Sequence, residues 1–140
     1  MLNGLLSSSA IPVLEQVVNF AQARHDVLAG NIANIDTPGY EARDLSVDSF
    51  RADLRSAIVA RDKPAVFRGG APSLDQPGHV GPKLATVADN AQTILRHDEN
   101  FVGLEHQVTE IAKNRLLHNT ALTIMTNQFR LLEAAIRERL

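Results

Sequence analysis

The stretch RHDVLAGNIANIDTPGYEARD, residues 24–44, decides how the first half of the chain folds. Asn31 and Asn34 are three residues apart, so they share one helix face beside apolar side chains. Asn is a poor former of helix interiors, and the pair weakens the last turns of a helix. Its amides offer donors and acceptors to a turn or to a neighbouring chain. Because Pro38 disfavours helical geometry at Thr37, the helix is expected to end just before this pair.

A tight turn is expected directly after the helix. Pro38-Gly39 is the central pair favoured by a type II β-turn, with Thr37 and Tyr40 on either side. Tyr40, the only tyrosine, is expected to pack on an apolar surface with its hydroxyl hydrogen-bonded. A helix C-terminus usually needs only a glycine, whereas about ten residues here each meet a different demand. The stretch therefore carries more sequence constraints than a helix end requires. An ordinary helix–turn unit is the simpler alternative.

Apolar residues outside this stretch follow helical spacing at both ends of the chain, in alternating steps of four and three. The first seam is Leu14, Val18, Ala21, His25, Leu28, Ile32 and Ile35. The second seam is Leu104, Val108, Ile111, Arg115, His118, Leu122, Met125, Phe129, Leu132 and Ile136. We expect helices over residues 10–36 and 104–140, paired as a coiled-coil-like unit in a mainly α fold. Their apolar seam residues are expected to pack together, within one subunit and between neighbours.

Three polar residues interrupt these seams: His25 in the first, and Arg115 and His118 in the second. We interpret them as a solvated or interfacial stretch. A metal site at His25 and His118 is the alternative, but it would need further ligands, and no second His lies at the i+3 or i+4 spacing.

The middle of the chain, residues 37–103, has a different texture. Residues 46–60 predict a short amphipathic helix on Phe50, Leu54, Ala57 and Ile58. Eight Pro and Gly residues then fall within 64–82, which forbids a continued helix and leaves room only for short strands. Those strands are expected at Thr86-Val87 and at 93–95. With a flexible segment at 1–9, we expect one domain overall.

Composition excludes several functions. Of the 140 residues, 44% are hydrophobic, only 4% are aromatic, and the net charge is −2, so no basic surface is available for nucleic acid. The absence of cysteine excludes disulfides and thiolate metal sites. Neither a membrane span nor a cleaved secretory signal is expected. Asp98, Glu99 and Glu105 lie where a helix start attracts acidic residues, so we assign no catalytic, cofactor or metal residue.

The segment NIANIDTPGY followed by EARD resembles the signature of bacterial flagellar rod and hook proteins, in which a terminal helix ends in an Asn-Ile-Ala-Asn-x-x-Thr segment. Its Thr-Pro-Gly-Tyr ending is similar to that of the short proximal rod subunits. Residues 100–104 are a weaker counterpart before the second helix, with Gly103 and Gln107 where acidic residues are common. The resemblance implies an assembly motif made of Asn31, Ile32, Ala33, Asn34, Asp36, Thr37, Pro38, Gly39 and Tyr40.

The resemblance also implies a function. It predicts a structural subunit of the proximal rod, which connects the membrane ring to the distal rod and transmits torque. The implied partners are copies of the chain itself, other flagellar rod proteins, and adaptor proteins at the membrane-ring and export-gate side of the rod base. The implied location is the periplasm, reached through the flagellar type III apparatus by an uncleaved N-terminal segment. The seams alone leave open a soluble helical adaptor that binds a partner helix.

Overall fold

The computed structural model describes residues 9–62, 87–88, 91, 93–95 and 104–137. In chain order, the elements are helix α2 (Ile11–Ala33), strand β1 (Arg43–Leu45), helix α3 (Val47–Asp62), strand β2 (Thr93–Leu95) and helix α5 (Leu104–Arg137). The fold is therefore mainly helical, with long N- and C-terminal helices and a short middle helix, as the sequence predicts. Most of the expected flexible segment 1–9 and the Gly/Pro-rich stretch 64–82 lie outside the described residues.

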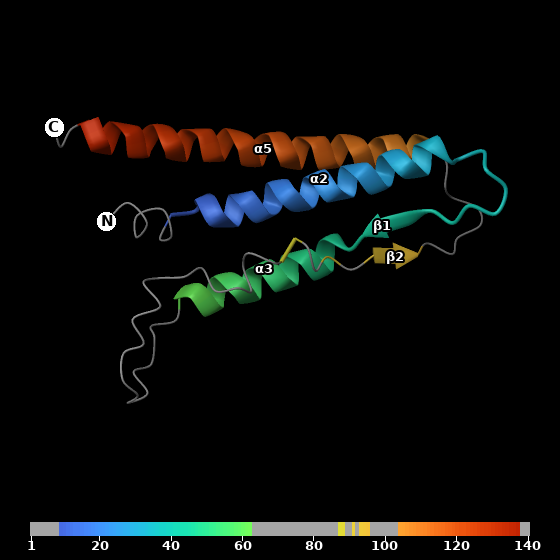
Figure 1. Ribbon diagram of the computed structural model, residues 1–140, viewed down its shortest axis with the longest axis horizontal. Coiled ribbons are helices and arrows are strands. Elements are labelled where there is room, and N and C mark those ends of the chain that lie inside the picture. The colour runs from blue at the N-terminus through green and yellow to red at the C-terminus, as the bar shows by residue number, and fades with distance from the viewer. Residues whose placement is uncertain (1–8, 63–86, 89–90, 92, 96–103, 138–140) are drawn as a thin grey trace, which may run out of the picture.

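The two long helices lie side by side and run in opposite directions, and α3 and the two strands lie along the other side of α2 (Figure 1). The Asn114 Nδ2 on α5 donates to the Ala21 carbonyl at 2.7 Å, which fixes the register of the pair. Because both helices rise equally per residue, the start of α2 at Ile11 lies opposite Ile124. The last turns of α5 therefore extend past the beginning of α2, as Figure 1 also shows.

The ends of α2 follow from a serine before it and an asparagine after it. The backbone N–H of Ile11 donates to Ser9 Oγ at 3.3 Å, and a proline occupies the first turn. At the other end, the Asn34 side chain donates to the Gly30 carbonyl at 2.8 Å, and its backbone N–H donates to the same oxygen at 3.2 Å. These bonds satisfy a terminal carbonyl. The helix consequently ends at Ala33, three residues before the expected end at residue 36.

The largest buried side chains lie between α2 and α3. Phe20 on α2 stacks on Phe50 on α3 with ring centroids 4.0 Å apart and ring planes 10° from parallel. Leu45, Ala57 and Val87 complete the cluster, together with Ala88. The expected helix over 46–60 is confirmed as α3. Phe20 lies outside the predicted seam, because α2 buries a second face against α3.

The two strands form a small antiparallel ribbon in which Arg43 pairs with Leu95 and Leu45 pairs with Thr93. The expected strand at 93–95 is confirmed as β2, whereas β1 was not predicted from the sequence. The strand expected at Thr86-Val87 is not found at Val87, which lies in a turn, and Thr86 is outside the described residues. None of the helices in the described ranges is long and apolar enough to cross a membrane.

Candidate assembly site

A buried arginine ties three elements together. Arg24 on α2 is only 6% exposed. Its Nε donates to Asp44 Oδ1 and its Nη2 to Asp44 Oδ2, each at 2.8 Å. Nη2 also donates to Glu110 Oε2 on α5 at 2.7 Å. One guanidinium therefore joins α2 to both β1 and α5, in the bidentate geometry that gives the strongest charge-assisted bonds.

The charges in this cluster shift one another's proton affinities. The hydrogen bonds that Arg24 donates to Asp44 are the largest cause that raises the pKa of Arg24, although burial opposes them. The Lys113 ammonium, 2.8 Å from Glu110 Oε1, is the largest cause that lowers the pKa of Glu110 from 4.5 to about 2, and Arg24 adds to it. Arg24 and Glu110 are therefore both charged at neutral pH.

Asn31 is the second buried polar link, at 1% exposure. Its Nδ2 donates to the Arg43 carbonyl at 2.6 Å, and its Oδ1 accepts from the Arg43 backbone N–H at 3.1 Å. The same side chain accepts from the Tyr40 hydroxyl at 3.1 Å and donates to Gln107 Oε1 at 3.3 Å. Asn31 thus satisfies both backbone groups of the first residue of β1, which holds the returning chain against α2.

The turn between α2 and β1 has the expected form. The Tyr40 N–H donates to the Thr37 carbonyl at 3.1 Å, and the Thr37 N–H donates to the Asn34 carbonyl at 3.0 Å. Gly39 has a φ of +76°, while Pro38 holds its own φ negative, and this combination defines a type II turn. Residues 36–41 are all exposed, and the expected hydrogen bond of the tyrosine hydroxyl is confirmed.

The other residues of the predicted assembly motif differ in exposure: some are half-buried and the rest lie on the surface. Asn34 and Ile32 are half-buried, and Ala33 is exposed. Asp36, Thr37, Pro38 and Gly39 all lie on the surface of the turn, and Tyr40 is 37% exposed despite its bond to Asn31. In the single chain, the exposed part of the motif is therefore held in place by its buried part.

The face of α5 that meets α2 is mostly polar. Its buried residues, Gln107, Asn114 and Ala121, recur in steps of seven. Gln107 contacts Asn31, and Asn114 contacts the Ala21 carbonyl. Asn114 Oδ1 accepts no hydrogen bond from any part of the chain that the structure describes. The α2–α5 contact thus depends on side-chain amides as well as on apolar packing.

This polar face corrects the expected packing of the two seams. On α2, Ala21 and Leu28 are buried and Leu14 and Val18 are half-buried. On α5, the half-buried seam residues are Ile111, Leu122, Met125 and Leu132, whereas the exposed ones are Leu104, Val108, Phe129 and Ile136. α5 is rotated about its axis so that its apolar seam lies beside the contact with α2. Gln107 and Asn114 occupy the contact because they hydrogen-bond to polar groups of α2, which apolar side chains could not do.

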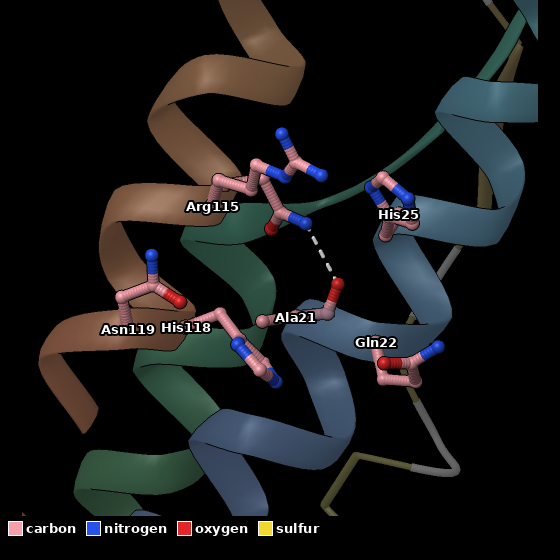
Figure 2. A pocket seen from close by; sticks show the side chains of 7 residues that line it. Ala21, Gln22, His25, Arg115, His118 and Asn119 are labelled. Carbon is pink, nitrogen blue, oxygen red and sulfur yellow. Dashed lines mark hydrogen bonds between the residues drawn. The ribbon is translucent and has the colours of Figure 1, made fainter. Parts of the chain in front are cut away.

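The three polar residues that interrupt the seams come together at one place. His25 and Gln22 on α2 and Arg115 and His118 on α5 line an open pocket of about 250 Å³, completed by Ala21, Asn114 and Asn119. Figure 2 shows Arg115 and His118 projecting from α5 toward α2. Across the residues that the structure describes, no group of three or more acidic or histidine side chains is arranged to hold a metal ion.

Sequence reasoning missed the charged and amide residues that connect the elements. Arg24 and Asp44 stand at the two ends of the stretch quoted first, twenty residues apart, and only the return of the chain along α2 brings them together. Gln107 and Asn114 carried a signal, since they lie seven residues apart on one face of the long helix. That spacing was obscured by the apolar residues beside it.

Comparison with known proteins identifies the family. The family described as flagella basal body rod protein matches residues 18–40, which contain Arg24, Asn31 and the turn. Over 129 residues, the chain is 30% identical to the flagellar basal body rod protein FlgB of Salmonella typhimurium, covering 87% of this chain and 88% of that protein. The FlgB of Escherichia coli gives the same identity and coverage. The FlgB of Aquifex aeolicus is 24% identical over 139 residues, which cover 92% of this chain and 94% of that protein.

These relatives are rod proteins, which are structural subunits and not enzymes. They are components of the flagellar basal body, where they assemble with its other components. The chain belongs to the FlgB family of flagellar basal body rod proteins.

Proposed function

We propose that the chain builds the proximal rod of the flagellum, connects the membrane ring to the distal rod, and transmits torque along that connection. The observation that carries the proposal is the exposed apolar surface of α5. Leu104, Val108, Phe129 and Ile136 flank the polar contact with α2 on one side, and Leu117, Ile124 and Leu131 lie on the other. An apolar surface of this extent is typical of a protein–protein contact.

Both flanks of α5 are available to helices of neighbouring subunits. The exposed fractions are 48% for Phe129 and 64% for Leu131, so both side chains offer apolar area that burial would stabilise. The seam residues of α2 and α5 would then pack between copies as well as within one. The partners in this proposal are copies of the chain, other rod proteins, and adaptor proteins at the export-gate side of the rod base.

The assembly motif has a separate role in this proposal. Asn31 and Arg24 hold the turn and β1 against α2, so they fix where the outer segment, β1 and α3, is attached to the paired helices. A rigid attachment at this point lets a torque that acts on the helices reach the outer segment without bending the chain between them. The chain reaches the periplasm through the flagellar type III apparatus, led by an uncleaved N-terminal segment.

Deletion of the gene tests the proposal, with motility assays and cryo-electron tomography of the basal bodies. We expect basal bodies that retain the rings and export apparatus but lack the rod. Intact rods in the deletion strain would contradict the proposal and favour the helical adaptor. Crosslinking would then identify the partner of that adaptor.

Complementation of that strain with surface variants tests the role of α5. Phe129→Asp should abolish swimming, because it places a charge in the apolar contact, while the purified variant keeps its helical circular dichroism. The matched control is Asn127→Asp, an exposed polar position two residues away, which should still swim. Normal swimming of the Phe129→Asp strain would show that this flank is not an assembly contact.

A further inference from the structure

The polar pocket between α2 and α5 has the chemistry of a site for an anionic side chain. Arg115 is exposed at its rim, and the ion pairs found among the described residues do not include it. His25 and His118 add two imidazoles, and the remaining polar lining consists of carboxamides. No lining residue is acidic, so the fork of donors on Arg115 has no carboxylate to bind within the pocket.

A matching acidic surface lies at the end of the same helix pair. Asp36 and Glu41 bracket the type II turn, and every residue from 36 to 41 is exposed. The sequence has no Lys or Arg between Arg24 and Arg43, so these two carboxylates lack a basic neighbour in the turn itself. The bond from Tyr40 to Asn31 holds the turn in one conformation. A partner would therefore meet a preorganised acidic loop, which lowers the entropy cost of binding.

The pocket and the turn of one chain are too far apart to meet. The eight residues from His25 to the end of α2 at Ala33 already span about 12 Å along the helix axis, and Asp36 lies in the turn beyond that end. A contact between the two surfaces must therefore join two copies. Such a contact uses different patches on the two partners, and contacts of this kind generate rings or open helical arrays.

We propose that the polar pocket of one copy binds a carboxylate of the Asp36–Glu41 turn of a second copy. The inference rests on the proposed function, since it names the partner surface that joins neighbouring subunits in the rod. It gives a role to His25, Arg115 and His118, which interrupt the apolar seams. Asp36 or Glu41 accepts from the Arg115 guanidinium, and the histidines and carboxamides surround the bound carboxylate.

Disulfide trapping tests this contact directly, because the chain contains no cysteine. The test pair is Thr37→Cys with Asn119→Cys, which leaves both turn carboxylates and Arg115 in place. The control pair is Ser56→Cys with Asn119→Cys, in which the first cysteine is at an exposed position of α3. Both double variants are expressed in the deletion strain, and isolated basal bodies are oxidised mildly and analysed by non-reducing electrophoresis.

The expected result is a disulfide-linked dimer from the 37/119 pair and none from the 56/119 pair. Basal bodies that contain the 37/119 protein but give no dimer would overturn the inference, as would equal dimer yields from both pairs. Both results are obtained from assembled rods that contain the variant protein. Failure of the proposed function would be seen in a different experiment, as intact rods in the deletion strain.

A charge swap provides an independent test. Arg115→Glu should abolish swimming, and adding Asp36→Arg and Glu41→Arg to the same chain should restore it at least in part, because the reversed charges attract again. The control is Arg130→Glu, a charge reversal at an exposed position of the same helix. Any loss of swimming that it causes should not be restored by Asp36→Arg and Glu41→Arg. If the Arg115→Glu chain is folded and exported but the swapped turn gives no rescue, the carboxylate comes from another subunit and the inference is wrong.

Discussion

Arg24 and Asp44 form a buried bidentate ion pair, with both N–O distances at 2.8 Å, between the middle of α2 and the strand that returns along it. The side chains of both residues are 7% exposed, so the pair is almost completely removed from water. Asp44 Oδ1 also accepts from the Leu45 N–H at 2.8 Å, which orients the carboxylate. This arrangement determines where the chain passes after the turn.

Replacing Arg24 by Met should destabilise the chain by about 3–5 kcal/mol, because the buried Asp44 carboxylate would lose both hydrogen bonds of its bidentate guanidinium partner. The measurement is urea unfolding of the purified protein, followed by circular dichroism. Arg137→Ala, which breaks an exposed pair with Glu133 on the last turn of α5, is the control and should change stability by less than about 1 kcal/mol. Equal effects of the two variants would contradict a structural role for Arg24.

The lowered pKa of Glu110 predicts how the free energy of unfolding depends on pH. Its pKa is lowered in the folded chain from 4.5 to about 2, first by Lys113 and then by Arg24. A lowered folded pKa stabilises the fold above the unfolded value, so this stabilisation is complete above pH 4.5 and is lost as the pH falls toward about 2. We expect a loss on the order of 2 kcal/mol, since the exposed Lys113 is partly screened by solvent. Urea unfolding across this range would measure it, and Glu110→Gln should show a smaller dependence on pH.

Asn31 should tolerate no substitution that removes its amide. Asn31→Ala leaves the part-buried backbone N–H and carbonyl of Arg43 without the Asn31 amide as their partner, at a cost of about 2–4 kcal/mol. Tyr40→Phe removes only the hydrogen bond of a partly exposed hydroxyl and should cost about 1 kcal/mol. Thermal unfolding of both variants would establish the order. A larger effect of Tyr40→Phe would mean that the turn is held by the tyrosine and not by Asn31.

Gly39 should be replaceable only by residues that accept a positive φ. A Cβ at Gly39 would meet no atom within 4 Å, so the penalty arises from the backbone alone, whose φ is +76°. Gly39→Val strains that conformation by about 2 kcal/mol or more, and we expect it to abolish rod assembly while export continues. Gly39→Asn, which adopts this region more readily, should retain swimming. Normal swimming of the Gly39→Val strain would refute the requirement for this turn.

The end of α5 should be the least protected part of that helix in the isolated chain. Residues after Ile124 extend past the start of α2, and Phe129, Leu131 and Ile136 among them are 48–64% exposed. Amide hydrogen exchange of the purified monomer should therefore be faster over 125–137 than over 107–122. Incorporation into basal bodies should slow exchange over 125–137. Equal protection of both segments in the monomer would show that α5 needs no neighbour.

The sequence alone determined the three helices, strand β2 and the turn. Periodic apolar residues predicted the two long helices and α3, because helical spacing is a local property of the chain. Pro38-Gly39 predicted the type II turn, because the backbone preferences of these two residues are also local. The family signature lies in this same local stretch.

Only the tertiary structure decided which faces meet. The apolar seam of α5 predicted a direct contact with α2, but Gln107 and Asn114 lie there instead, since their amides find partners on Asn31 and Ala21. Arg24, Asp44 and Glu110 are far apart in sequence, and the return of the chain along α2 places their charges within hydrogen-bond distance. The rotation of a helix about its axis depends on every partner it meets, and a burial pattern read from one helix contains no information about those partners.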